Sequence, residues 1–274
     1  MPSTDPNYLK HGLKGKHQDI VEKLREHLPN FIIIGAAKSG TTSLAATLQR
    51  HPQVFMTSKP KEPKFFGRNY ENGWEWYANL FSRGNAASKP ARGEASTMYT
   101  SALPRFAVTA KLMRLYLPEL KLIYVTRHPL DRVVSQWRHL KGKDADYTPF
   151  NEILTKKNPA NLILGCSRYF ERISAFRAEF PDNQILPVTF EDLLADPSAE
   201  IKRILSFLGV DPAIDILGDT GLAHENQAGA QNRELVPKPT WAPEFKQRVI
   251  AELQSDTAQF LKWMGKPADY WELK

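Results

Sequence analysis

Residues 31–43 of the chain read FIIIGAAKSGTTS. Phe31–Ile34 is an apolar run rich in β-branched residues, which is typical of a strand buried on both faces of a sheet. A loop with two glycines follows it, and Thr41–Arg50 carries two leucines at helical spacing. A strand, a glycine loop and a helix in this order are the usual opening of a nucleotide-binding α/β domain, so this stretch decides the predicted fold class.

The glycine loop presents a row of hydrogen-bond donors to an anion. Backbone N–H groups at the start of a helix bind anions, and hydroxyl groups add to them. The predicted donors are Lys38, Ser39, Gly40, Thr41, Thr42 and Ser43. Gly35 and Gly40 have the spacing of a Walker A motif, but Thr41 occupies the place of its lysine. Lys38 lies earlier in the loop, where it suits the bridging oxygen of a shorter anhydride better than a β,γ-phosphate pair beside Mg²⁺.

A second strand, turn and helix unit ends its strand in a cation. Residues 121–126 read KLIYVT and predict a buried strand, after which Arg127 opens the turn into a helix over Leu130–Leu140. A Walker B strand would instead end in an aspartate that helps to hold Mg²⁺. Arg127 suits a second anion because a guanidinium binds phosphate through two hydrogen bonds. Ser135, two turns into the helix, is predicted to face the same point. The two strand ends therefore predict two anion sites and no metal site.

The remaining periodicity predicts a three-layer fold. Strands are predicted over Gln184–Val188, Ala91–Ala95 and Val54–Met56, and helices over His17–His27, Arg168–Phe180, Asp196–Leu208 and Pro243–Trp263. Strands that alternate with helices form a parallel sheet, so the fold class is α/β and P-loop-like, with helices on both faces of a central parallel sheet. No linker divides the chain. We therefore predict an N-terminal arm and short helix over residues 1–29 and a single domain over residues 30–274.

Composition narrows the classes of protein further. The 274 residues are 42% hydrophobic and 24% charged, which is ordinary for a globular protein. The net charge of +7 fits either an anionic partner or a solvated basic surface, and charge alone favours the surface. No block of five or six like charges marks a nucleic-acid tail, so no nucleic-acid partner is predicted. No apolar run approaches the roughly 20 residues that span a bilayer, and the first thirty residues carry no apolar signal segment. The single cysteine, Cys166, excludes an internal disulfide, and we expect a cytoplasmic protein.

Two of these motifs resemble those of a known family. The loop from Ile34 to Leu44 is similar to the 5′-phosphosulfate loop of sulfotransferases that use 3′-phosphoadenosine 5′-phosphosulfate (PAPS) as donor. Residues 127–135, RHPLDRVVS, resemble that family's 3′-phosphate motif, in which an arginine and a serine eight residues later bind the phosphate. Resemblance to the heparan-modifying and bacterial branch rests on His51-Pro52, on the run KEPKFF at 61–66, and on residues 93–96 and 190–197.

The resemblance implies a reaction and roles for further residues. It implies transfer of a sulfuryl group from PAPS, without a metal, to a hydroxyl or amine of an acceptor, with carbohydrates and small alcohols as the favoured classes. Lys38 is implied at the bridging oxygen, and Glu62 matches the catalytic glutamate. Two phenylalanines follow Glu62 closely, so we expect burial to raise its pKa toward that of a general base. The alternative is that Glu62 is an exposed loop residue paired with Lys61 or Lys64. Glu94 is the second candidate base, because it ends a predicted strand; the alternative is a structural acid that orients Lys38 or a loop amide. Arg233, in the long loop over Leu217–Thr240, is implied to contact the adenosine diphosphate part.

Three features depart from the heparan-modifying pattern. Ala95 stands where those enzymes usually carry a lysine, and Thr97 stands where they carry a proline. Cys166 alone rules out the disulfide near their C-terminal cofactor loop. These departures argue against a heparan-like polyanionic acceptor and leave the donor motifs intact.

Other interpretations stay open on sequence grounds. A P-loop kinase or NTPase with an atypical loop would lack both the Walker lysine and the Walker B acid. A non-catalytic PAPS-binding module would lack the base, whereas Glu62 and Glu94 are both present. His51 and His128 are alternative bases, but structural roles are favoured for both. The aromatic residues of the segment Tyr70–Phe81 either line an acceptor cleft or pack into the core, and the core is favoured.

Overall fold

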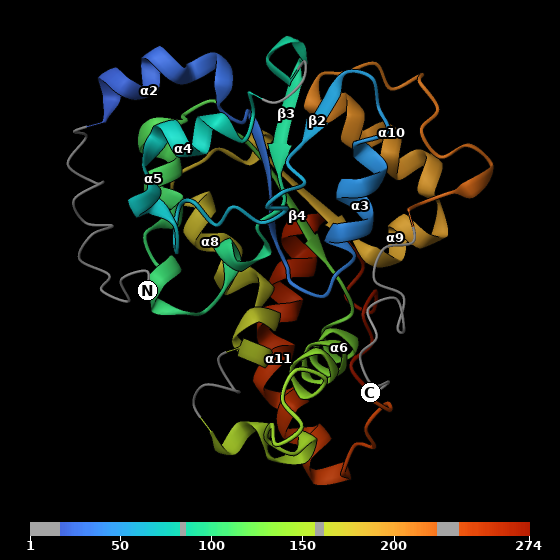
Figure 1. The fold of residues 1–274 in the computed structure, drawn as a ribbon. Coiled ribbons are helices and arrows are strands. Elements are labelled where there is room, and N and C mark those ends of the chain that lie inside the picture. The colour runs from blue at the N-terminus through green and yellow to red at the C-terminus, as the bar shows by residue number, and fades with distance from the viewer. Residues whose placement is uncertain (1–16, 83–85, 157–161, 224–235) are drawn as a thin grey trace.

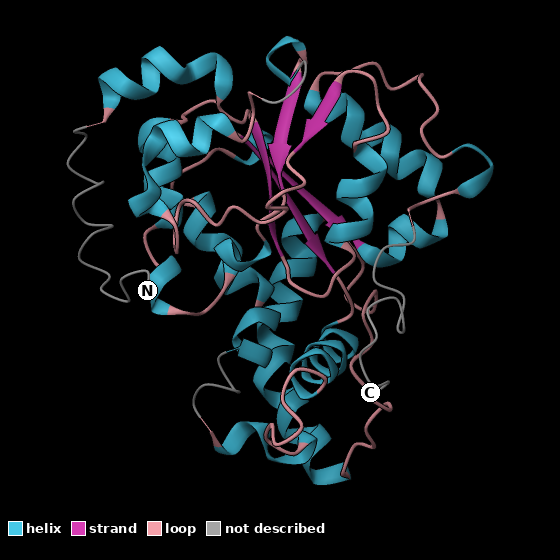
Figure 2. Ribbon diagram, viewed as in Figure 1, coloured by secondary structure: helices cyan, strands magenta, loops and turns pink. Residues whose placement is uncertain are grey.

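The computed structural model describes residues 17–82, 86–156, 162–223 and 236–274. These residues form a five-stranded sheet in which every neighbouring pair of strands is parallel, in the order β2-β3-β1-β4-β5. The strands are β1 (Phe31–Gly35), β2 (Val54–Met56), β3 (Ala91–Glu94), β4 (Lys121–Thr126) and β5 (Ile185–Thr189). Figures 1 and 2 show the sheet running through the middle of the molecule with helices on both of its faces. The predicted α/β three-layer fold is therefore confirmed.

Strands β1 and β4 contribute side chains to a hydrophobic core on each face of the sheet, because both faces are covered. Ile32 and Ile34 belong to the hydrophobic core on one face, and Phe31 and Ile33 belong to the core on the other. All four side chains are fully buried. A strand covered on both faces needs apolar residues at every position, which is why β1 reads as an unbroken apolar run.

The helices divide between the two faces. One face is covered by α2 (Gln18–Leu24), α4 (Gly73–Asn79), α5 (Thr109–Tyr116), α8 (Tyr169–Arg177) and the C-terminal half of α11 (Pro243–Met264). The other face is covered by α3 (Thr41–Leu48), α9 (Phe190–Ala195) and α10 (Pro197–Leu208). Short 3-10 helices occupy Arg25–His27, Tyr70–Asn72, Ala86–Ser88, Thr97–Thr100, Pro104–Phe106, Phe150–Thr155, Gly165–Ser167, Asp182–Gln184 and Gly218–Thr220.

A third, smaller core lies at the carboxyl end of the sheet. It joins α6 (Pro129–Lys141) to the N-terminal half of α11, and Figure 1 shows these two helices side by side below the sheet. Val133, Trp137, Val249 and Leu253 are buried in it. Since α6 begins directly after β4, this core fixes the direction in which the chain leaves the sheet.

The predicted elements are present with small shifts at their ends. The segment predicted as one helix over 17–27 is an α-helix followed by a 3-10 turn. Val21 of α2 and Leu28 are buried in the same core as α4. The predicted domain boundary at residue 30 stays a prediction. No helix in the described part of the chain is both long and apolar enough to cross a bilayer.

The sheet order decides where a ligand can bind. The chain leaves β1 toward β2 and β3 on one side, and then returns to place β4 and β5 on the other side. Ligands of open α/β sheets bind at the carboxyl ends of the strands beside such a change of direction. The loops that follow β1, β3 and β4 meet at this point.

Candidate functional site

Residues 35–43, from the last residue of β1 to the first turn of α3, are the first predicted anion site, and we call them the anion loop. Lys38 has φ 71° and Gly40 has φ 85°, so the chain turns twice through the left-handed region. Gly40 is required there because a Cβ atom would lie 2.5 Å from the ring of Phe190. Helix α3 begins at Thr41 without a side-chain cap and without an acidic residue in its first turn. The N–H groups of that turn have no partner inside the helix, and they are oriented toward the loop.

A buried cation lies directly behind the anion loop. Arg132 of α6 is fully buried, and its guanidinium donates to the backbone oxygens of Ala37 and Ile163 and to the hydroxyl of Ser167. Among the described residues, it forms no ion pair with a carboxylate. A buried charge that is held only by neutral acceptors favours an anion nearby.

The turn after β4 carries the second predicted anion site. The Nε atom of Arg127 is buried and has no hydrogen-bond partner among the described residues. Its Nη2 atom lies 3.7 Å from the half-exposed carboxylate of Asp131, which is a weak surface ion pair. The backbone oxygen of Arg127 accepts from the hydroxyl of Tyr169 at 2.6 Å, so the turn itself is held from behind. The guanidinium therefore keeps donors for a phosphate.

One aromatic ring connects the two anion sites. Phe190, the first residue of α9, packs against Gly40, and the guanidinium carbon of Arg127 lies 5.1 Å from the centre of the same ring. Next to it, Glu191 accepts from the backbone N–H of His128 at 2.8 Å and from the indole N–H of Trp271 at 3.1 Å. Residues after β5 thus hold both strand ends in place. The sequence offered only a motif resemblance for residues 190–197, with no sign of these contacts.

The two predicted carboxylates have opposite surroundings. Glu94 is fully buried at the end of β3, whereas the side chain of Glu62 is 26% exposed. Burial raises the pKa of Glu94 to about 7, while hydrogen bonds from Ser96, Tyr77 and Tyr99 oppose that rise and the nearby Glu62 adds to it. The expectation that Glu62 is the buried carboxylate is wrong. The two phenylalanines after Glu62 turn into the core while the glutamate stays at the surface of the site.

Glu62 is held between a cation and a hydroxyl. Its Oε2 atom lies 3.0 Å from Nζ of Lys64, and its Oε1 atom accepts from the hydroxyl of Thr97 at 3.1 Å. Lys64 has φ 52°, so the backbone turns sharply between Glu62 and the buried phenylalanines. A carboxylate with partial exposure and fixed partners can reach a ligand.

Lys61 connects the segment of Glu62 to the anion loop, whereas the sequence offered it only as an alternative ion-pair partner of Glu62; the ion-pair partner in the structure is Lys64. Its Nζ atom donates to the hydroxyl of Thr42 at 2.5 Å. Thr42 lies in the first turn of α3, so this ammonium group lies on the rim of the anion loop. No local pattern marks the contact, because 19 residues separate the two partners.

Other predicted site residues have simpler outcomes. Ser39 and Thr41 are buried in the anion loop, and Ser135 lies partly exposed in the second turn of α6. The shared contact of Arg127 and Ser135 with a phosphate stays a prediction. Arg233 lies outside the described residues.

The favoured structural roles of the aromatic residues and of His51 agree with the structure, whereas the role of His128, whose buried Nδ1 has no hydrogen-bond partner among the described residues, stays a prediction. Trp74, Tyr77 and Phe81 are buried in the core rather than exposed in a cleft. His51 is buried, accepts from the backbone N–H of Gln53 at 3.1 Å and lies 2.9 Å from the backbone oxygen of Asp211, which uses both ring nitrogens.

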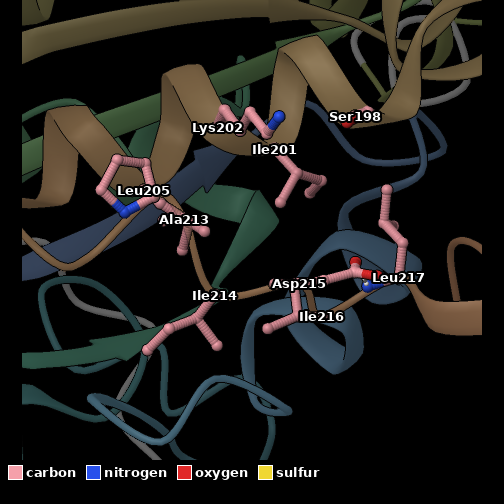
Figure 3. A pocket seen from close by; sticks show the side chains of 10 residues that line it. Ser198, Ile201, Lys202, Leu205, Ala213, Ile214, Asp215, Ile216 and Leu217 are labelled. Carbon is pink, nitrogen blue, oxygen red and sulfur yellow. Dashed lines mark hydrogen bonds between the residues drawn. The ribbon is translucent and has the colours of Figure 1, made fainter.

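A cavity of about 420 Å³ lies apart from these strand ends (Figure 3). It is enclosed by one side of α10 and by residues 212–217, with Ile201 and Ile214 on facing walls. The carboxylate of Asp215, which also lines it, accepts from the backbone N–H groups of Leu217 and Gly218. None of the lining residues belongs to the loops that form the two anion sites.

Among the described residues, no three His, Cys, Asp or Glu side chains gather as metal ligands. The expectation that no metal takes part stays a prediction.

Comparison with known proteins identifies the family. A family model described as a sulfotransferase domain matches residues 28–262. The chain belongs to the sulfotransferase family. The match covers both anion sites and both carboxylates, and it favours sulfuryl transfer over the kinase or NTPase interpretation.

Curated relatives of this sulfotransferase include enzymes that modify heparan sulfate. Heparan sulfate glucosamine 3-O-sulfotransferase 3A1 of Mus musculus is 30% identical over 198 residues, which cover 70% of this chain and 48% of that protein. Bifunctional heparan sulfate N-deacetylase/N-sulfotransferase 2 of Bos taurus is 30% identical over 221 residues, covering 73% of this chain and 24% of that protein. The chain thus spans about half the length of the first relative and a quarter of the second.

Solved structures share the fold. A sulfotransferase from Alicyclobacillus acidocaldarius superposes with a TM-score of 0.71 at 24% identity, covering 89% of this chain and 98% of that one. A mouse sulfotransferase solved in complex with PAP has a TM-score of 0.55 at 17% identity, covering 92% of this chain and 95% of that one.

Proposed function

We propose that this sulfotransferase transfers a sulfuryl group from PAPS to a hydroxyl or amine of an acceptor, with a carbohydrate as the favoured acceptor. The observation that carries the proposal is the pair of cationic strand ends packed on one ring: the anion loop and Arg127 both contact Phe190. PAPS carries two anionic groups on one nucleoside, the 3′-phosphate and the 5′-phosphosulfate, and these suit two such sites. The uncapped α3, the unpartnered Nε of Arg127 and the buried Arg132 all fit an anionic donor.

The donor side of the site divides into two tasks. Residues 39–43 and Lys38 are assigned to the 5′ end, where backbone N–H groups and an ammonium group stabilise the charge that grows on the leaving phosphate. Arg127 and Ser135 are assigned to the 3′-phosphate, which they bind without contact to the reacting atoms. Lys61, hydrogen-bonded to Thr42, adds a second cation at the 5′ end. When bound, PAPS supplies the sulfuryl group and leaves as adenosine 3′,5′-diphosphate.

Glu62 is assigned as the general base. In the reaction a bond forms between the acceptor oxygen or nitrogen and sulfur, the bond between sulfur and the 5′-phosphate oxygen breaks, and the acceptor proton passes to the carboxylate. Glu62 is partly exposed and lies in the same segment as Lys61, which contacts the anion loop. Glu94 is fully buried among hydroxyl groups, so no acceptor can reach it.

The acceptor class rests on the relatives named above, since their names describe sulfation of a polysaccharide. Ala95 and Thr97 depart from the heparan-modifying pattern, so we favour a carbohydrate acceptor without requiring a polyanionic chain. A hydroxyl or amine acceptor satisfies the chemistry equally, because Glu62 needs only a transferable proton.

Two measurements test the proposed function. Incubation with ³⁵S-labelled PAPS and a panel of heparan oligosaccharide, chondroitin oligosaccharide, alkyl glycoside and primary alcohol is expected to give a labelled product with at least one acceptor. Adenosine 3′,5′-diphosphate is expected to raise the melting temperature more than ATP with Mg²⁺ does. The proposal fails if no acceptor is labelled, and the donor assignment fails if ATP stabilises the protein equally well.

A further inference from the structure

Glu94 is the centre of a buried hydrogen-bond network that the proposed reaction does not use. Its Oε1 atom accepts from the hydroxyls of Tyr77 and Tyr99, each at 2.8 Å, and its Oε2 atom accepts from the hydroxyl of Ser96. All four side chains are fully buried. Three donors converge on one carboxylate, which offsets part of the cost of removing it from water.

Two of the three hydroxyls also hold the segment that carries Glu62. Ser96 Oγ accepts from the backbone N–H of Lys64 at 2.8 Å, and Tyr99 Oη accepts from the backbone N–H of Phe66 at 3.4 Å. Each hydroxyl can donate only one hydrogen bond, and in both cases it donates that bond to the carboxylate of Glu94. The hydroxyl oxygens are therefore left as acceptors for the two amides. The hydroxyl of Tyr77 contacts Glu94 alone among the described hydrogen bonds.

The segment needs such support because its backbone is strained. Lys64 adopts φ 52°, a left-handed conformation that is unfavourable for a residue with a side chain. Strained backbone persists only where surrounding contacts hold it, and it is common at functional sites. The turn at Lys64 separates the partly exposed Glu62 from the buried Phe66.

We propose that Glu94 is a positioning residue for Glu62. By accepting hydrogen bonds from the hydroxyls of Ser96 and Tyr99, it leaves their oxygens oriented toward the amides of Lys64 and Phe66 and so fixes the turn that presents Glu62. The proposal rests on the assignment of Glu62 as the base in the proposed function. It gives the second carboxylate of the site a role that involves no contact with the acceptor.

Tyr99→Phe and Tyr77→Phe form a matched pair that tests it. Each removes one buried phenol that donates to the same carboxylate oxygen at 2.8 Å, but only Tyr99 also holds an amide of the Glu62 segment. We expect Tyr99→Phe and Ser96→Ala to lower kcat by about 10- to 100-fold more than Tyr77→Phe does. The KM for PAPS and the affinity for adenosine 3′,5′-diphosphate are expected to change by less than about twofold, because the donor side is untouched.

Amide hydrogen exchange gives a second reading that needs no acceptor. Exchange in a peptide covering residues 61–67 is expected to speed up by roughly tenfold in Tyr99→Phe and Ser96→Ala, and to stay near that of the wild-type protein in Tyr77→Phe. Melting temperatures of the two phenylalanine variants serve as the control for general loss of stability.

The outcomes separate this proposal from the proposed function. Equal losses of kcat in the two phenylalanine variants, or unchanged exchange over residues 61–67 in Tyr99→Phe, would overturn the positioning role. A wild-type protein that labels no acceptor would overturn the proposed function instead, and the exchange pattern would still decide whether the Glu94 network holds the segment.

Discussion

The two sides of β1 differ in their buried charged group at the carboxyl end of the sheet, which is Arg132 on the side of β4 and Glu94 on the side of β3. On the side of β4 and β5 lie Arg127 and the buried Arg132, both connected to the anion loop through Phe190 or Ala37. On the side of β3 and β2 lie the carboxylates of Glu94 and Glu62. In the proposed function, this separation assigns the anionic donor to the arginine side and the acceptor proton to the carboxylate side, so that the two tasks use different side chains.

Within the carboxylate side the contrast is one of burial. Glu94 is fully buried and accepts three hydroxyl hydrogen bonds, whereas Glu62 is partly exposed between Lys64 and Thr97. Acceptor-side chemistry requires access, so exposure rather than pKa decides which carboxylate can act as base.

The largest expected effect concerns Glu62. Glu62→Gln is expected to lower kcat by roughly 10²–10⁴-fold while the affinity for adenosine 3′,5′-diphosphate stays unchanged, because the amide cannot take the acceptor proton. Steady-state kinetics with labelled PAPS and isothermal titration with adenosine 3′,5′-diphosphate measure the two quantities.

Glu94→Gln is the matched variant for this prediction, since it makes the same replacement of a carboxyl group by an amide on the same side of β1. If Glu62→Gln keeps near-normal turnover while Glu94→Gln abolishes it in a folded protein, the roles of the two carboxylates are reversed. If neither matters, His51 and His128 are the next residues to replace.

Lys38 lies in the anion loop after β1, between the side of the arginines and the side of the carboxylates. Lys38→Ala is expected to lower kcat by about 10²–10³-fold and donor affinity far less, because the ammonium group acts mainly on charge that develops during transfer. Lys59→Ala, which removes an exposed lysine, is the control and is expected to change neither quantity. A loss of donor affinity as large as the loss of kcat would assign Lys38 to ground-state binding instead.

Replacing Arg127 tests the side of β4 and β5 without changing the carboxylates on the other side of β1. Arg127→Ala is expected to weaken the binding of adenosine 3′,5′-diphosphate by about 1.5–3 kcal/mol, or roughly 10- to 150-fold in Kd, because a charge-assisted contact to the 3′-phosphate is lost. Binding of adenosine 5′-phosphate is expected to change little.

Asp131→Asn provides the control for Arg127, since it removes only the exposed ion-pair partner at 3.7 Å. Its effect on both ligands is expected to stay within about twofold. An equal loss of affinity for the two adenine nucleotides in Arg127→Ala would contradict its assignment to the 3′-phosphate.

The smallest expected effect is a pH dependence of stability. Burial raises the pKa of Glu94 from its ordinary value of 4.5 to about 7, so between these values the folded protein binds a proton that the unfolded chain has released. Stability therefore falls as pH rises through this window. Relative to Glu94→Gln, the melting temperature of the wild-type protein is expected to fall by about 3–8 °C between pH 5 and pH 8.

The groups that face Glu94 change its pKa and therefore affect this prediction. Tyr77, Ser96 and Tyr99 donate to it, and Glu62 is the charged neighbour that raises its pKa further. Asp256, whose pKa burial raises to about 6, titrates in both proteins and cancels in the difference. A difference in melting temperature that does not vary with pH would show that Glu94 keeps an ordinary pKa.

The sequence by itself determined the strands and the two anion motifs. The runs at 31–34 and 121–126 are apolar at nearly every position because both faces of their strands are covered, and such a pattern is local. Lys38 and Arg127 follow these strands closely in the chain, and parallel strands present their carboxyl ends at one edge of the sheet, so both cations could be predicted at that edge.

Only the tertiary structure decided how the site is held together. Phe190 reaches Gly40 and Arg127, Lys61 reaches Thr42, and Glu94 gathers hydroxyls from α4 and from the 3-10 turn after β3. The burial of Glu94 and the exposure of Glu62 follow from these distant contacts. Local composition suggested the reverse, because two phenylalanines closely follow Glu62. Hydrophobic neighbours in sequence do not bury a carboxylate when the backbone turns between them, and that turn depends on partners about thirty residues away.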